Sequence, residues 1–222
     1  MRRSILAIGS TAILVFAAVG AALTVPAVFA HADHDSGVKP SAAAFHDAMR
    51  NLWEDHITWT RLYIVSAATT PEALPDLAAT ADRLLQNQAD IGDALRPFFG
   101  DAAGDAVTAL LREHILTAAA LIDAAKAGDG AEVQAQTAAW YDNAERIAAA
   151  LHALDPRHWP LADLESMMTA HLDQTLEEAA ARLQGRYADD VTAYEAIHAD
   201  ILHMADMLSD GIVARFPDRF RG

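Results

Sequence analysis

Residues 107–121 read VTALLREHILTAAAL, and this stretch shows the pattern that decides the fold. The residues that recur at steps of three and four are Val107, Leu110, His114, Thr117 and Leu121. This spacing places them on one face of an α-helix and leaves the opposite face polar. The stretch therefore predicts an amphipathic helix whose buried face includes one histidine.

Proline and glycine residues divide the chain at regular intervals into six segments of helical length. The segments cover residues 41–69, 71–96, 101–127, 130–154, 160–184 and 186–215. They are rich in strong helix formers such as Ala, Leu, Glu and Arg, and they lack β-branched runs. Cap residues stand at three of the starts, namely Ser41, Thr70 before Pro71, and Asp129 with Glu132 three positions later. We therefore predict an all-α fold, a helical bundle of about six helices.

A shared pattern relates the first, third and fifth segments. Each has an apolar residue, three further positions, a histidine and then Ile or Leu. The histidines of this pattern are His56, His114 and His171, which are 58 and 57 residues apart. A period of this length is typical of a repeated helical hairpin.

The second, fourth and sixth segments match one another as well. Residues 84–91 align without a gap on residues 140–147, which places Asn87 over Asn143. The sixth segment matches more loosely and has His203 at this position. We therefore predict three αα-hairpin repeats of about 57 residues. A closed bundle over residues 41–217 suits such few and degenerate copies better than an open solenoid.

The repeat places one histidine on or beside the apolar face of the first helix in each hairpin. If the hairpins surround a common axis, His56, His114 and His171 would meet at a similar depth, with water or His203 in a fourth position. Zn²⁺ and Cu²⁺ favour such a set of neutral imidazoles. The alternative is that each histidine bonds the asparagine of its own hairpin and only sets the register of the two helices.

Methionine and histidine also gather in the last hairpin. The residues concerned are Met167, Met168, His171, His198, His203, Met204 and Met207. Thioether and imidazole together form a soft ligand set that favours copper, so His198 and His203 are further candidate metal ligands. Methionine also fills irregular gaps in protein cores, which is the alternative interpretation.

The amino-terminal residues predict export. Arg2 and Arg3 precede an apolar run over residues 5–30, which is the pattern of a secretory signal peptide. The run is also long enough to span a bilayer, so cleavage and retention as a membrane anchor both remain open. Residues 31–40 predict a flexible tether. In either case we expect the domain outside the cytoplasm, secreted or anchored to the outer face of the cytoplasmic membrane.

Charge and composition narrow the choice of partners. The chain has 16 basic and 31 acidic residues, a net charge of -15. Such a surface repels nucleic acid and anionic lipid. We expect a metal cation or a protein partner, and membrane contact only through the amino-terminal segment. The absence of cysteine excludes disulfides and thiol nucleophiles, and no glycine-rich nucleotide loop is present, so an enzyme is the less favoured interpretation.

Four strings resemble a group of exported bacterial proteins of unassigned function. They are LWEDH at 52–56, LLQNQ at 84–88, WPLAD at 159–163 and HMADML at 203–208. The resemblance extends over residues 50–217 and implies an exported helical bundle without established catalytic residues. Some members carry the label of glycosyltransferase, which the lack of an α/β pattern in this sequence does not support.

Two functions are compatible with the sequence. The first is an exported envelope protein that binds a transition metal, Cu or Zn, through the repeat histidines and serves in storage or sensing. The second is a non-catalytic helical module that binds a protein or an apolar ligand. In that case the histidine and asparagine pairs are purely structural.

Overall fold

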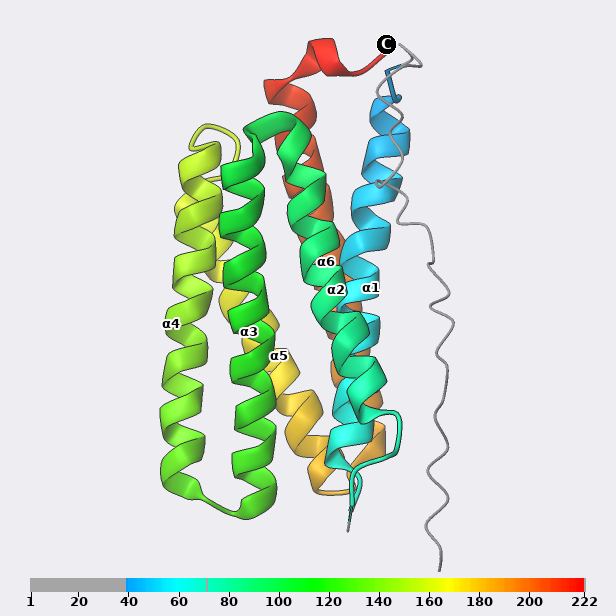
Figure 1. Cartoon of the computed structure of the whole chain (residues 1–222), viewed down its shortest axis with the longest axis vertical. Coiled ribbons are helices and arrows are strands. Elements are labelled where there is room, and N and C mark those ends of the chain that lie inside the picture. The colour runs from blue at the N-terminus through cyan, green and yellow to red at the C-terminus, as the bar shows by residue number, and fades with distance from the viewer. Residues whose placement is uncertain (1–38, 71, 222) are drawn as a thin grey trace, which may run out of the picture.

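The computed structural model describes residues 39–70 and 72–221, which form a single helical bundle (Figure 1). The elements are α1 (Ala42–Ala68), α2 (Leu77–Phe99), α3 (Asp101–Ala127), α4 (Gly130–Leu154), α5 (Leu161–Leu183), α6 (Tyr187–Arg215) and the 3₁₀ helix η1 (Pro217–Arg219). The described part of the chain contains no strand, so the predicted all-α fold is confirmed. The predicted export segment, residues 1–30, and the tether up to residue 38 lie outside the described residues.

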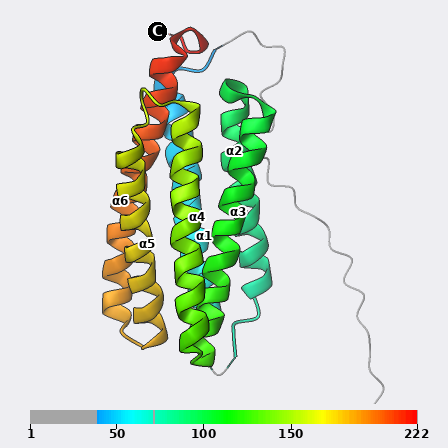
Figure 2. The same ribbon diagram turned by 90° about the vertical axis from the view of Figure 1, so that its left-hand side faces the viewer.

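The six long helices close into a ring. Each packs against the next one along the chain, and α1 packs against α6 (Figures 1 and 2). Helix α1 also contacts α3 and α5, so the odd-numbered helices approach one another inside the ring. This arrangement is a closed bundle rather than an open solenoid, because the first and last helices are in contact.

Helix α2 begins later and ends later than predicted. It begins at Leu77, and no side chain caps it, so the predicted cap at Thr70 is wrong. It continues through Pro97, where Phe98 and Phe99 pack against aromatic rings of α1 and of the segment before α5. A proline in the last turn removes one backbone hydrogen bond, and the packing of two phenyl rings offsets that loss.

The other two predicted caps are present. The Ser41 hydroxyl accepts a hydrogen bond from the backbone N–H of Ala44, at 3.1 Å. The Asp129 carboxylate accepts bonds from the backbone N–H groups of Ala131 and Glu132, each at 3.1 Å. These bonds satisfy donors that the first turn of a helix leaves free, and they set where α1 and α4 begin.

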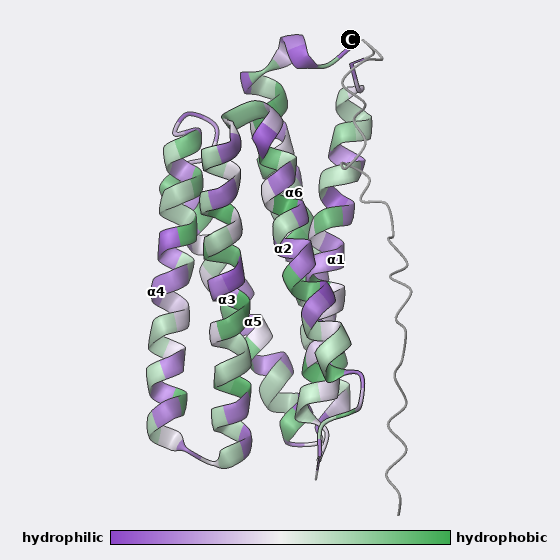
Figure 3. Cartoon of the chain, in the orientation of Figure 1, coloured by the Kyte–Doolittle hydropathy of each residue, from purple (hydrophilic) through white to green (hydrophobic). Residues whose placement is uncertain are grey.

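Every helix carries both hydrophilic and hydrophobic residues, as its amphipathic pattern predicts (Figure 3). Among the helices described here, none combines the length and apolar character needed to cross a bilayer. We call the half of the bundle that contains the α2–α3 and α4–α5 connections the upper half, and the opposite half the lower half (Figure 1).

Aromatic side chains close the upper half. Trp159 is fully buried, and its ring centre lies 5.4 Å from that of Phe99. A Cβ atom at Gly211 would lie 2.2 Å from Nε1 of Trp159, so this position on α6 has room only for glycine. The indole can therefore pack directly on the α6 backbone, which ties the α4–α5 connection to the last helix.

Candidate metal centre

The three repeat histidines meet in the core between the two halves. His56, His114 and His171 lie near the middle of α1, α3 and α5 and are only 2, 3 and 6% exposed. The ring centre of His171 is 5.7 Å from that of His56 and 6.1 Å from that of His114. The structure therefore brings together the three candidate ligands that the repeat pattern singled out.

All three rings are neutral at pH 7. Burial lowers the pKa of His114 to about 3 and that of His171 to about 4. Burial, and then the charges that His171 and His114 would carry, hold the pKa of His56 well below its usual value. Neutral imidazole is the form that binds a metal ion, so protonation does not compete at pH 7.

A hydrogen bond determines which nitrogen of His114 carries the proton. The amide nitrogen of Asn143 donates to the carbonyl of Leu110 at 3.1 Å, which fixes the orientation of the amide. Its oxygen lies 3.0 Å from Nδ1 of His114 and can only accept, so Nδ1 carries the hydrogen. The lone pair is left on Nε2. Metal-binding histidines are oriented in the same way, by a bond from the other ring nitrogen.

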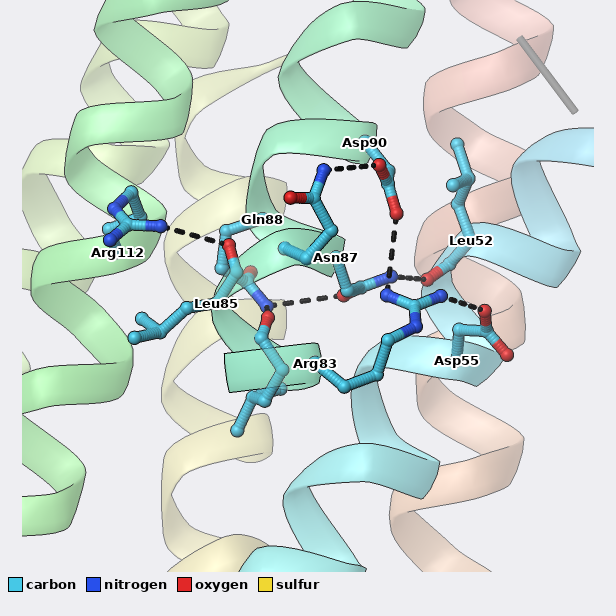
Figure 4. A network of polar contacts seen from close by, with 10 residues as sticks. Leu52, Asp55, Arg83, Leu85, Asn87, Gln88, Asp90 and Arg112 are labelled. Atoms are coloured by element: carbon cyan, nitrogen blue, oxygen red, sulfur yellow. Dashed lines mark hydrogen bonds and ion pairs between the residues drawn. The ribbon is translucent and has the colours of Figure 1, made fainter. Parts of the chain in front are cut away.

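His56 lacks this support. Asn87 donates to the carbonyl of Leu52 at 3.0 Å, but its oxygen accepts from Gln88 at 3.1 Å rather than from histidine (Figure 4). Nδ1 of His56 is buried and has no hydrogen-bond partner. Because buried polar atoms are nearly always bonded, this nitrogen indicates a missing partner or a ring that is free to turn.

The first two hairpins share one bond at matching positions. In each, asparagine of the second helix donates to the carbonyl four residues before the histidine, at Leu52 and Leu110. The third hairpin has His203 at the asparagine position, and this side chain is exposed. The direct bond between histidine and asparagine forms only in the second hairpin, so the three histidines are not uniform register pins. The threefold repeat itself stays a prediction.

Charged side chains link α2 to α1 and α3, the helices that carry His56 and His114 (Figure 4). Arg83 on α2 pairs with Asp55 on α1 at 3.0 Å and with Asp90 at 3.3 Å. Arg112 on α3 donates to the carbonyl of Leu85 on α2 at 3.1 Å. These contacts join α1, α2 and α3 at the depth of the asparagine bonds, and they help to hold the two rings at one level.

Two tryptophans flank the histidines. The ring centre of Trp140 lies 5.0 Å from that of His114, and the ring centre of Trp53 lies 5.9 Å from that of His56. Both indoles are buried. Two of the three imidazoles therefore lie beside buried indole rings, and burial is the main cause of the lowered pKa values of all three.

The remaining candidate ligands lie apart from this cluster. His198 is partly exposed, and its Nε2 lies 2.9 Å from the carboxylate of Glu54. His203 is exposed on α6. Met168 and Met204 are buried among the apolar core residues. Within the described residues, neither His198 nor His203 stacks against the three buried rings, and the methionines act as core fillers.

His46 contacts α6, which the sequence does not predict. Its Nδ1 lies 2.6 Å from the hydroxyl of Ser209, and its Nε2 lies 3.3 Å from the carboxylate of Asp210. The three residue types are those of a nucleophilic triad, but serine and aspartate contact the opposite ring nitrogens, and Ser209 is fully buried, so its hydroxyl cannot reach a substrate. No local signal could have indicated this contact, because the partners are 163 positions apart.

The two ring separations that involve His171 are somewhat longer than those of a metal site. Three imidazoles bound to one tetrahedral ion at about 2.0–2.1 Å have ring centres about 5 Å apart. The separations here are 5.7 and 6.1 Å. As the side chains stand, no group of three or more His, Asp or Glu among the described residues is arranged to hold an ion. Binding therefore requires the rings to turn and to move closer together.

Comparison with known proteins adds no relative. No protein-family model, curated protein sequence or solved structure matches the chain. The resemblance to exported bacterial proteins therefore stays a prediction, and the function must be inferred from the residues of this chain alone.

Proposed function

We propose that the domain binds one transition metal ion, Zn²⁺ or a copper ion, between His56, His114 and His171. The observation that carries the proposal is that three neutral imidazoles from three different helices meet in one buried layer. Histidine is usually a surface or half-buried residue, and a buried group of three is costly unless the rings have partners.

Two further features support the proposal. The proton on Nδ1 of His114 leaves Nε2 as a lone-pair donor. Nδ1 of His56 forms no hydrogen bond as the side chains stand, although the polar side chain of Gln88 acts on this ring. With His171 they supply three nitrogen ligands, and a fourth position is left for water. Copper(II) would bind such a set more tightly than zinc.

The burial of the site favours storage or sensing rather than catalysis. All three rings are at most 6% exposed, so a substrate has no direct path to an ion held among them. Catalytic metal sites keep an open position that faces a substrate. With the predicted export segment, the domain would hold its ion outside the cytoplasm.

The test is a metal titration of the metal-free full-length protein with Zn²⁺ and Cu²⁺, followed by calorimetry and elemental analysis. We expect one ion per chain. Replacing His171 with Asn should weaken binding by at least about 100-fold, because even the loss of a supporting hydrogen bond around a metal costs about 10–100-fold. The electron paramagnetic resonance spectrum of the Cu²⁺ form should show coupling to three nitrogens.

The matched control is His203→Asn, which alters an exposed histidine on α6. It should change the affinity by less than about twofold, since it removes no ligand. Circular dichroism establishes that each variant folds. The proposal is wrong if the unaltered protein binds no ion at micromolar concentrations, or if His171→Asn and His203→Asn weaken binding equally.

A further inference from the structure

A cavity of about 170 Å³ lies between the helices of the lower half of the bundle and is partly open to solvent, where Ala125 is exposed. Helices α1 to α5 all contribute to its wall. The residues four positions after the three histidines, namely Thr60, Ala118 and Thr175, all line it. Four residues make about one turn of a helix, so the cavity begins about 6 Å below the histidine layer. It adjoins the candidate metal centre and is separate from it.

The wall of the cavity is apolar in its chemistry. The hydroxyl of Thr60 donates to the carbonyl of His56 at 2.7 Å, and that of Thr175 to the carbonyl of His171 at 2.8 Å. Thr137 likewise donates to the carbonyl of its own helix at 2.7 Å. Because these hydroxyls are already bonded, the threonines contribute mainly their methyl groups to the wall. The other lining residues are Ala, Ile, Leu and Val, with one Tyr and one Trp.

Small side chains keep the space open. Five alanines line it, namely Ala118, Ala119 and Ala125 on α3 and Ala179 and Ala180 on α5. A leucine at such positions would occupy much of the space. A dry apolar cavity of about 150 Å³ is large enough to admit benzene or xenon. The size of this cavity is therefore that of one aromatic ring.

Water and charged molecules do not suit this space. A buried water needs two to four polar partners, whereas among the fully buried side-chain atoms of the wall only the indole N–H of Trp140 is left without a partner. An ion would lose its hydration without gaining a counter-charge. An uncharged apolar molecule needs neither hydrogen-bond partners nor a counter-charge. It gains dispersion contacts with the wall atoms, which lack such contacts on the side that faces the cavity.

We propose that this cavity binds a small, uncharged, apolar molecule of about the size of one aromatic ring. The binding does not depend on a metal ion, so it can be tested in the metal-free protein. The outcome of this test is independent of the outcome for the metal centre.

The experiment uses benzene as the probe on metal-free full-length protein. At about ten times the dissociation constant, a single-site ligand should raise the midpoint of thermal unfolding by about 3–6 °C. The variant Ala118→Leu fills the cavity from α3. It should unfold at the same or a higher temperature without benzene, and it should lose the response to benzene.

The matched control is Ala139→Leu, which adds the same side chain on the exposed face of α4 and should keep the full response. If Ala118→Leu does not fold, Ala179→Leu fills the cavity from α5 and gives the same test. Methyl proton NMR should show benzene contacts with the wall residues. The proposal is overturned if benzene at its solubility limit neither shifts the midpoint nor perturbs these methyl groups. An undiminished response in the folded filling variants would also overturn it.

Discussion

The upper and lower halves of the bundle hold together by different means. Around Met49, Trp53 and Leu208 in the upper half, the packing leaves a void of only about 10 Å³. In the lower half the cavity next to Thr60 and Thr175 measures about 170 Å³. The histidine layer lies between them. Since well-packed cores leave few voids larger than a water molecule, the upper half is an ordinary core and the lower half is not.

The lower half also buries charges. Arg61 on α1 lies 2.7 Å from the carboxylate of Glu178 on α5 and 2.7 Å from that of Asp190 on α6. Arg182 lies 3.4 Å from Asp190. Glu178 and Asp190 are each only 1% exposed. The upper half buries one carboxylate as well, since Asp155 is 1% exposed and lies 3.4 Å from Arg215. The cavity, rather than buried charge alone, therefore distinguishes the lower half.

The largest change in the free energy of unfolding should come from a fall in pH, which protonates the buried histidines between the two halves. The pKa values of His114 and His171 are lowered from 6.5 to about 3 and about 4. Their stabilising contribution is present above pH 6.5 and is lost as the pH falls through 6.5 toward those values, at about 1.4 kcal/mol per pKa unit for each group. Urea unfolding at pH 7 and pH 4.5 should show a loss of several kcal/mol.

Glu178 has the opposite effect on the pH dependence of stability. Burial raises its pKa from 4.5 to about 7, so its contribution is largest below pH 4.5 and is lost as the pH rises toward 7. The two lowered histidine pKa values together outweigh this single raised one. Stability that stays constant between pH 7 and 4.5 would contradict the neutral histidine layer. In Glu178→Gln, the loss on acidification should be steeper.

The next effect concerns the ion cluster of the lower half. Replacing Arg61 with Met leaves Glu178 and Asp190 buried without their main partner, which should cost about 3–5 kcal/mol at pH 8. The cost should shrink near pH 5, because Glu178 is then protonated. Denaturant unfolding of the single variant and of Arg61→Met with Glu178→Gln measures both effects. An unchanged stability at pH 8 would show that these carboxylates are solvated.

The smallest effect compares packing in the two halves directly. Ala148 in the upper half is fully buried, and enlarging it to Leu should cost about 1–3 kcal/mol by overpacking. Ala179→Leu in the wall of the lower cavity should change stability by less than about 1 kcal/mol. Equal losses in the two variants, measured by urea unfolding, would remove the distinction between the halves.

Local sequence signals predicted most of the fold, with clear limits. The caps at Ser41 and Asp129 were predicted because cap and helix start are neighbours in sequence. The end of α2 beyond Pro97 was not, because the aromatic packing that holds Phe98 and Phe99 comes from other elements. The same limit applies to the histidine site. The burial of His114 follows from its position on the apolar helical face, whereas the hydrogen bond from Gln88 to the Asn87 oxygen cannot be predicted from a local pattern.

By itself, the sequence determined six amphipathic helices and the faces that they bury. Helix periodicity and capping depend on residues within a few positions of one another, so they can be read along the chain. Only the tertiary structure decided the separations of 5.7 and 6.1 Å between histidine rings, the cavity below them and the partners of Arg61. These depend on how helices far apart in sequence cross and on which side chains fill the space between them, a property of the whole packed bundle.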